Sequence, residues 1–308
     1  MVQSMVASIH FPNLGIELNH VGSSIDVFGF EITYYGIIIA IGMVAGYFVA
    51  EWQAKRTKQN PDLYLDFALY AIIFSVIGAR LYYVAFAWEE FKDNPISILN
   101  TRNGGLAIYG GVIAGILTAF FYTKIKKISF GLLVDTGCLG LLTGQIVGRW
   151  GNFFNREVFG KYTNNLFAMR LDIRDVSSDY TNPVSYIAAK YAEQPETLKH
   201  ILEIREKSVL IDGITYIQVH PTFLYESVWN LCVLILLILY SPKKKFHGEV
   251  TLLYLLGYGL GRFWIEGIRT DQLYLWDSPI AVSQLLSALL ITMAAIIIIA
   301  KRMSLNRK

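Results

Sequence analysis

Two arginines stand out because each lies near the end of a long apolar segment, where a charged side chain is costly unless it serves a function. They are Arg149 and Arg262. A guanidinium group is planar and offers paired donors that match the oxygens of a phosphate. Two such groups at one membrane depth predict a site for a phospholipid head group.

The segment that follows Arg149 combines amide, guanidinium and carboxylate side chains with glycine. Arg149 and Asn152 are three residues apart and share a face if the helix continues. Gly151 and Gly160 are expected to let the chain leave the helix and expose backbone N–H groups. Helix packing alone accounts poorly for this concentration of polar groups at a membrane boundary.

Two further arginines lie at the same predicted depth. Arg80 comes late in an apolar segment, and Arg269 follows Arg262 and Glu266. Both are equally consistent with a functional role and with side chains that extend to the outer membrane surface.

The elements that position these residues follow from composition. The chain has 308 residues, of which 54% are hydrophobic and 17% charged, whereas soluble domains carry about 25% charged residues. A membrane span needs about 20 apolar residues, and seven segments are predicted to span. They are residues 32–51, 66–87, 104–123, 131–150, 222–240, 249–265 and 280–300. Glycines four apart, such as Gly42/Gly46 and Gly140/Gly144, predict close packing of these helices.

Basic residues fix the expected orientation. Clusters of Lys and Arg follow the first, third, fifth and seventh predicted spans, and the other short connections are poor in them. The clusters are Lys55, Arg56 and Lys58; Lys124, Lys126 and Lys127; Lys243, Lys244 and Lys245; and Lys301, Arg302, Arg307 and Lys308. The positive-inside rule places all four in the cytoplasm, with the N-terminus outside and the C-terminus inside. Residues 1–31 are expected to be an outer lead-in without a cleavable signal peptide.

The long connection after the fourth span is predicted to be a small extracytoplasmic α/β head. Residues 166–171 and 214–219 are expected to form strands, and residues 185–192 and 196–206 helices. The resulting fold is an all-α polytopic membrane protein with this inserted head. Its expected parts are residues 1–151, the lead-in with four spans; 152–221, the head; and 222–308, three spans and a cytoplasmic tail. No motif for a metal or organic cofactor is apparent, and the net charge of +3 is too small to indicate a nucleic-acid partner.

Residues 148–160 resemble the signature of the prolipoprotein diacylglyceryl transferase family, G-R-x-G-N-F-x-N-x-E-x-x-G, at every fixed position. Four other segments are similar to motifs of the same family in the same order. They are Tyr34-Tyr35-Gly36, residues 104–111, residues 220–226 and residues 258–269. Five motifs in order, covering almost the whole chain, make the resemblance specific. The head at residues 161–219 is its least similar part.

The resemblance implies a reaction and a location. Family members transfer the diacylglyceryl group of phosphatidylglycerol to the thiol of the lipobox cysteine in a prolipoprotein, forming a thioether and releasing glycerol phosphate. They act in the bacterial inner membrane, with the active site expected to face the outer leaflet. Phosphatidylglycerol and the lipobox segment are therefore the expected partners.

The resemblance also implies site residues. Arg149 and Arg262 would hold the phosphate. The expected catalytic residues are Arg149, Arg262, Tyr35, Asn152, Glu157 and Glu266. The expected phosphatidylglycerol-binding residues are Arg149, Arg262, Asn152, Asn155, Gly160, Tyr109, Arg269 and His220.

One position departs from the family pattern and leaves the general base open. The family usually has histidine after the Gly-Gly-Leu-Ala-Ile run, and this chain has Tyr109. A tyrosine, with an ordinary pKa near 10, is a poor base at neutral pH. His220, Glu157 and Glu266 are the other candidates, although His220 also fits a packing role before Pro221, and each glutamate also fits an ion pair.

Two other function classes fit an apolar chain with charges in its spans. A transporter or channel would place polar groups along the full depth of several spans, whereas here they gather toward one side. A different enzyme acting on phospholipid head groups, without a protein acceptor, remains an alternative on sequence grounds. A membrane scaffold without catalysis does not explain the clustered arginines.

Overall fold

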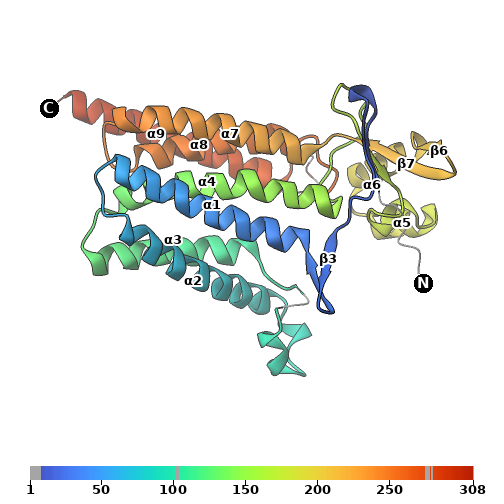
Figure 1. Cartoon of the computed structure of the whole chain (residues 1–308), viewed down its shortest axis with the longest axis horizontal. Helices are drawn as coiled ribbons and strands as arrows, with labels where there is room; N and C mark the ends of the chain where they lie inside the picture. Colours follow the sequence, from blue (N-terminus) through green and yellow to red (C-terminus); the bar gives the residue numbers. More distant parts are fainter. Residues whose placement is uncertain (1–7, 102–103, 275–277, 279, 308) are drawn as a thin grey trace. The chain divides into compact units, whose positions relative to one another are not determined.

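The computed structural model describes residues 8–101, 104–274, 278 and 280–307, and they form a mostly helical protein with a small region of sheet (Figure 1). The chain divides into two compact units. One comprises residues 1–45, 142–237 and 252–308, and the other residues 46–141 and 238–251. Lys308 of the predicted basic cluster and residues 1–7 of the predicted lead-in lie outside the described residues.

Each of the seven predicted apolar segments coincides with a long helix. These are α1 (Tyr34–Arg56), α2 (Asp62–Phe86), α3 (Ile108–Lys126), α4 (Phe130–Asn155), α7 (Thr222–Tyr240), α8 (Glu249–Glu266) and α9 (Val282–Asn306). The predicted bounds of α7 are confirmed, and α1, α4 and α9 continue beyond their predicted ends. The α4 extension matters most, because it carries the helix through Asn152 to Asn155.

Six of these helices are long and apolar enough to cross a membrane: α1, α2, α3, α4, α7 with the turn after it, and α9. Only 17% of the most apolar window of α9 is buried inside the protein, so its apolar surface needs an apolar solvent such as lipid. The remaining helix, α8, is 18 residues long and carries Glu249, Arg262 and Glu266. These charges lower its hydropathy and set it apart from the other six.

In the unit formed by residues 46–141 and 238–251, glycines allow helices to touch through their backbones. A Cβ atom added to Gly46 on α1 would lie 2.5 Å from the carbonyl oxygen of Gly140 on α4. The predicted close packing through small residues is therefore confirmed at this pair.

Arg80 on α2 has a structural role in the same unit. Arg80 is 8% exposed. Its guanidinium donates hydrogen bonds to the carbonyl oxygens of five residues in the connection to α3. They are Ser97, Ile98, Asn100, Gly104 and Gly105. The side chain therefore orders this connection and does not extend to the surface, so the surface interpretation of Arg80 is wrong.

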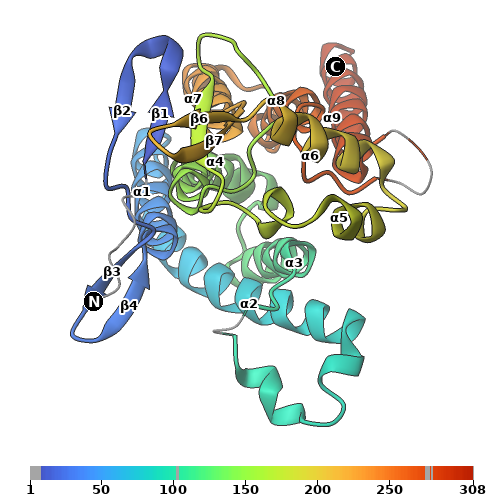
Figure 2. The same ribbon diagram turned by 90° about the vertical axis from the view of Figure 1, so that its right-hand side faces the viewer.

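The other unit contains the head, whose five-stranded antiparallel sheet has the order β2-β1-β5-β7-β6 (Figure 2). The strands are β1 (Ile9–Phe11), β2 (Ile16–Leu18), β5 (Met169–Asp172), β6 (Val209–Ile211) and β7 (Ile214–Val219). The short helices are α5 (Val184–Lys190) and α6 (Pro195–Glu206). Both predicted helices of the head are found, and β7 has its predicted bounds. The strand predicted at residues 166–171 is found in part, as β5, which begins at Met169 and ends at Asp172.

The N-terminal lead-in belongs structurally to this sheet. Strands β1 and β2 pair with each other, and β1 pairs with β5. A separate hairpin, β3 (Ser24–Val27) and β4 (Phe30–Thr33), leads into α1. Its turn places Phe28 and Gly29 at positive φ, as a two-residue hairpin turn requires.

The core of the head joins it to the ends of two long helices. Apolar side chains from the inner face of the sheet pack with residues of α6, with Phe153 near the end of α4 and with Phe223 at the start of α7. The rings of Phe153 and Phe223 lie 5.0 Å apart. This continuous core fixes the ends of α4 and α7, on which the polar residues of the candidate site stand.

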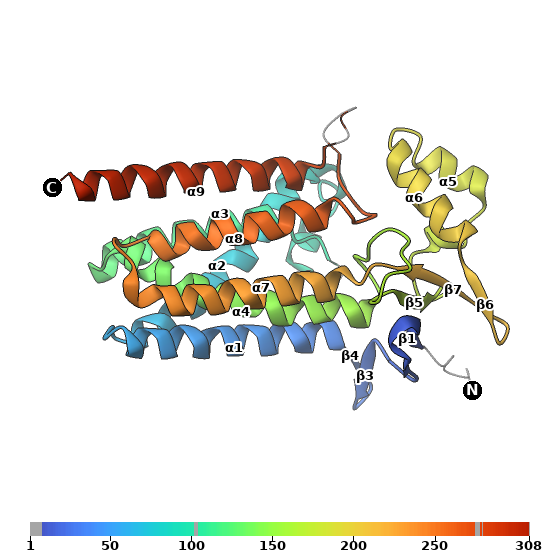
Figure 3. The ribbon, with the colours of Figure 1, turned by 90° about the horizontal axis from the view of Figure 1, so that it is seen from above.

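Helices α4, α7, α8 and α9 pack side by side in this unit (Figure 3). The indole of Trp150 on α4 donates to the hydroxyl of Ser227 on α7, at 3.3 Å. Trp229 on α7 donates to the carbonyl oxygen of Gly257 on α8, at 2.9 Å, and its ring lies against Gly261. Arg149, Glu226 and Arg262 are thereby held on neighbouring helices.

Candidate active site

A buried carboxylate on α7 joins the two arginines that the sequence singles out. Glu226 is 4% exposed. Its Oε1 accepts a hydrogen bond of 2.8 Å from Nη1 of Arg262, and its Oε2 contacts Nε of Arg149. The two guanidinium groups, from α8 and α4, therefore converge on one anionic group.

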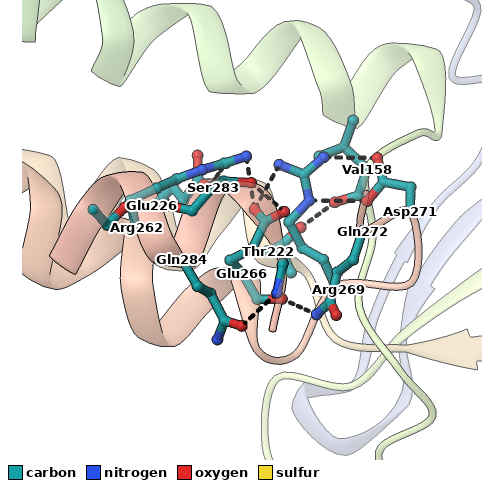
Figure 4. A network of polar contacts seen from close by, with 12 residues as sticks. Val158, Thr222, Glu226, Arg262, Glu266, Arg269, Asp271, Gln272, Ser283 and Gln284 are labelled. Carbon is teal, nitrogen blue, oxygen red and sulfur yellow. Dashed lines mark hydrogen bonds and ion pairs between the residues drawn. The ribbon is translucent and has the colours of Figure 1, made fainter. Parts of the chain in front are cut away.

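A second carboxylate extends this cluster toward α9 (Figure 4). Oε2 of Glu266 lies 2.7 Å from Nη2 of Arg262 and 3.6 Å from Nη1 of Arg269. Its Oε1 accepts a hydrogen bond of 2.8 Å from the hydroxyl of Ser283. Arg269 in turn binds the carboxylate of Asp271 through two nitrogens, at 2.9 and 2.6 Å.

Arg269 is therefore part of the cluster. It is 8% exposed and makes ion pairs with Glu266 and Asp271. The interpretation that its side chain extends to the membrane surface is wrong, because the residue is buried and its guanidinium pairs with the buried carboxylate of Glu266 as well as with the exposed Asp271.

Glu226 is the residue that sequence reasoning missed. Glu226 ends the motif of residues 220–226, and a carboxylate in the second turn of an apolar helix needs a cationic partner. That requirement was the available signal. It did not reveal which arginine would be the partner, and the structure shows that there are two.

A line of polar contacts leads outward from Arg149. Its Nη1 donates to Oδ1 of Asn152, at 3.3 Å, as expected if the helix continues. The amide of Asn152 donates to Glu157, at 3.0 Å, and Asn155 donates to the same carboxylate oxygen, at 3.2 Å. Glu157 is exposed and is bound by two amides, with no arginine paired to it in the described part of the chain. It therefore lies at the edge of the cluster.

Tyr35 lies against the same part of α4. A Cβ atom on Gly151 would lie 2.6 Å from the ring of Tyr35, so this glycine makes room for the tyrosine. The expectation that the chain leaves the helix at Gly151 is wrong, because α4 continues to Asn155. The continuous helix keeps Arg149 and Asn152 on one face.

Gly160 joins three segments through its backbone. Its N–H donates to the carbonyl oxygen of His220, at 2.9 Å, and the residue pairs with Arg269 in an isolated bridge. A Cβ atom here would lie 2.7 Å from Cβ of His220 and 2.8 Å from the carbonyl oxygen of Ile268. The expectation that Gly160 exposes a free backbone N–H is wrong. The glycine supports the site by allowing this close approach.

His220 lies just before α7 and faces the head. Its Nδ1 is 3.2 Å from the hydroxyl of Tyr225 and 3.5 Å from the amide nitrogen of Asn165. Burial and the positive charge of Lys161 lower the pKa of the imidazole below its ordinary value of 6.5. The ring is therefore neutral at neutral pH, as a proton acceptor must be. Tyr109 lies on α3 in the other compact unit, where its side chain is exposed.

The charges of the cluster balance. Arg149, Arg262 and Arg269 are matched by Glu226, Glu266 and Asp271. A new anion at the position between Arg149 and Arg262 would therefore replace the carboxylate of Glu226. Among the described residues, no group of three or more His, Cys, Asp or Glu side chains is arranged to hold a metal ion.

The head carries a separate cavity of about 430 Å³ on its sheet. Its lining includes His10, Glu17 and Arg170, together with residues of the β6–β7 hairpin. No residue of the arginine cluster lines this cavity, so the two features are distinct.

The fold and this site define a helical membrane protein with a buried cluster of arginines and carboxylates where its helices meet an α/β head. The chain belongs to the prolipoprotein diacylglyceryl transferase family, whose sequence profile matches residues 23–300. Relatives named phosphatidylglycerol–prolipoprotein diacylglyceryl transferase cover most of the chain. The protein of Enterococcus faecalis is 40% identical over 284 residues, covering 92% of this chain and 91% of the relative. That of Bacillus cytotoxicus is 38% identical over 273 residues, covering 89% of each.

Proposed function

We propose that this protein transfers the diacylglyceryl group of phosphatidylglycerol to the lipobox cysteine of a prolipoprotein. The observation that carries the proposal is the convergence of Arg149 and Arg262 on one anionic position. The names of the relatives supply the two substrates, since each names phosphatidylglycerol and a prolipoprotein. The family and the apolar helices support a multi-pass membrane protein.

The proposed topology has seven spans, with α8 as the sixth. Its support is that α8 lies between α7 and α9 in the sequence, and that its site-forming charges, Arg262 and Glu266, stand in its last turns. Basic residues at the C-terminal ends of α1, α3 and α9 favour a cytoplasmic location for those ends. In this topology the N-terminus, the head and the site face the outer leaflet of the bacterial inner membrane.

In the proposed reaction, the cysteine thiolate attacks the glyceryl carbon that carries the phosphate ester. A carbon–sulfur bond forms, the carbon–oxygen bond breaks, and glycerol phosphate leaves with the bonding electrons. Negative charge increases on the leaving phosphate, so fixed cations in a water-poor site lower the barrier. We assign this role to Arg149 and Arg262.

The other predicted site residues have supporting roles in this proposal. Asn152 orients Arg149, and Glu266 orients Arg262 and Arg269. Tyr35, Asn155 and Glu157 border Arg149 and Asn152. Gly160 and His220 hold the loops beside them, and Tyr109 is assigned to the lipid-binding surface. The thiol proton has three candidate acceptors, His220, Glu157 and Glu266, and the pH dependence of their single variants distinguishes them.

An assay with purified protein tests the proposal. Phosphatidylglycerol labelled in its head-group glycerol and a lipobox peptide are incubated with the enzyme in detergent. Thioether-linked peptide and labelled glycerol phosphate should appear in equal amounts, and a peptide with alanine in place of cysteine should give neither. Arg149→Ala and Arg262→Ala should abolish both products.

Arg174→Ala is the matched control for these variants. Arg174 binds Asp172 in the head, so its loss removes an arginine without touching the cluster. Release of glycerol phosphate without thioether would identify a lipid hydrolase. The absence of both products from the wild-type protein would refute the proposal.

A further inference from the structure

The carboxylate of Glu226 occupies the position between the two arginines that the proposed function gives to phosphate. It contacts Arg149 through one oxygen and Arg262 through the other. A phosphate group likewise presents two oxygens to two guanidinium groups. One position therefore has two anions that compete for it, one belonging to the protein and one to the lipid.

Glu226 is held by fewer groups than two other buried carboxylates, Glu266 and Asp135. Among the described residues, Oε2 of Glu226 has the ion contact with Arg149 and no hydrogen-bond partner. Oε2 of Glu266 likewise has only ion contacts, but with two arginines, Arg262 and Arg269, and its Oε1 accepts a hydrogen bond from Ser283 on α9. Asp135, in the other unit, accepts from two backbone N–H groups, a hydroxyl and Lys244.

This difference separates a fixed carboxylate from an exchangeable one. Asp135 and Glu266 have donors from several segments, so moving either would leave several buried groups without partners. Within the part of the chain that the structure describes, moving Glu226 breaks its contacts with Arg149 and Arg262, and an incoming phosphate restores both. The cost of displacing Glu226 is therefore offset at once by the ligand.

We propose that Glu226 is an exchangeable counter-ion: the phosphodiester of phosphatidylglycerol displaces its carboxylate from Arg149 and Arg262, and its return expels the product phosphate. This inference rests on the proposed phosphate-binding role of the two arginines. No covalent step involves Glu226, which acts by competing for the cations that bind the substrate.

The charge of the product explains why such competition is useful. The phosphodiester of the lipid carries one negative charge, whereas the phosphate monoester of glycerol phosphate carries nearly two at neutral pH. Two partly buried arginines hold the second anion more tightly than the first. Without a competing carboxylate, release of the product would become the slow step of the cycle.

The test compares glycerol phosphate binding to wild-type protein and to Glu226→Gln. Glutamine has the same shape and no charge, so it cannot replace an anion. We expect the Kd for glycerol phosphate to fall about tenfold or more. Steady-state transfer should slow after a first turnover of normal amplitude, and added glycerol phosphate should inhibit the variant at lower concentration than the wild type.

A matched control and a second variant make the test decisive. Glu203→Gln makes the same chemical change on α6 of the head, where Glu203 pairs with Lys207, and should leave the Kd unchanged. Glu226→Asp keeps the charge but shortens the side chain, so it should also bind glycerol phosphate more tightly than the wild type. It serves as the folding-conservative variant if the glutamine form does not accumulate.

The possible results separate two hypotheses. Unchanged or weaker glycerol phosphate binding in a folded Glu226 variant overturns the exchange role. Unchanged binding in Arg149→Ala and Arg262→Ala overturns the phosphate-binding role itself, which belongs to the proposed function. Tighter binding in the Glu226 variants, together with lost binding in the arginine variants, supports both.

Discussion

Oε1 of Glu226 lies 2.8 Å from Nη1 of Arg262, and this contact joins the second turn of α7 to the last turns of α8. The partners are 36 residues apart in the sequence. Both side chains are shielded from solvent, and a water-poor environment strengthens the attraction between them. The pair therefore fixes the position of the Arg262 guanidinium before any ligand binds.

Arg262→Lys tests whether charge alone is sufficient at this position. Arg262 reaches Glu226 and Glu266 with two different nitrogens, whereas lysine has a single ammonium group and lacks this fork. We expect the rate of thioether formation to fall about a hundredfold, with no large change in thermal stability. A lysine variant with the wild-type rate would contradict a role for paired donors.

Glu266 and Glu157, the two glutamates among the expected catalytic residues, should contribute differently to the free energy of unfolding. Glu266 is 2% exposed and pairs with Arg262 and Arg269, so Glu266→Gln leaves buried charge without a partner. We expect a loss of about 3–5 kcal/mol in the free energy of unfolding. The unfolding temperature in detergent, measured as the temperature at which half of the protein is lost from solution, compares this variant with the wild type.

Glu157→Gln is the comparison, because Glu157 is exposed and bound by two amides. This variant should unfold within a few degrees of the wild type while losing transfer activity. If Glu157→Gln and Glu266→Gln lowered the unfolding temperature equally, burial of the carboxylate would not determine the stability that each glutamate contributes.

Gly160→Ala should destabilise the junction between the head and the helices. The added Cβ would lie 2.8 Å from the backbone oxygen of Ile268, and backbone cannot move aside as a flexible side chain can. Overpacking of this kind costs about 1–3 kcal/mol. We expect a lower unfolding temperature and faster proteolysis of the head.

Gly137→Ala serves as the control for this substitution. At Gly137 the nearest atom to an added Cβ is a ring carbon of Phe67, at 3.9 Å, which is ordinary contact. That variant should resist heat and protease as well as the wild type does. A Gly160→Ala protein of wild-type stability would mean that the junction adjusts to the added methyl group.

The elements of this fold were largely predictable from the sequence because their signals are local. Apolar length predicted the long helices, and β7 was predicted with its observed bounds. The hairpin before β7 follows from Asp212-Gly213, both at positive φ, which is the usual chemistry of such a turn. The pairing of β1 with β5 was not predictable, because its partners are about 160 residues apart and no local pattern records which strands meet.

The site shows the same distinction between contacts within one segment and contacts between distant segments. Arg149 and Asn152 share a helix face, so their contact followed from spacing alone. The meeting of Arg149 with Glu226 depends on how α4 packs against α7, and no spacing rule describes that packing. Arg80 shows that position alone can also suggest a site residue wrongly. It comes late in an apolar segment, as Arg149 does, yet its guanidinium binds carbonyl groups of the connection between α2 and α3.

Acid should loosen the head through two histidines, the buried His200 and the partly buried His220. Burial and the nearby charge of Lys161 lower the pKa of both His200 on α6 and His220 below 6.5. A histidine whose pKa is lower in the folded protein takes up protons more readily when unfolded. Its contribution to stability is complete above the unfolded pKa and is lost as the pH falls below about 6.5.

His200→Gln tests this effect away from the proposed site. His200 is 8% exposed, and its Nδ1 has no hydrogen-bond partner in the described part of the chain. Between about pH 7.5 and pH 5 the variant should lose less stability than the wild type, as measured by proteolysis of the head or by thermal unfolding. His20→Gln controls for the loss of a histidine, because His20 is exposed. If all three proteins lose stability in parallel, the acid sensitivity arises elsewhere, and the buried imidazole of His200 does not contribute to it.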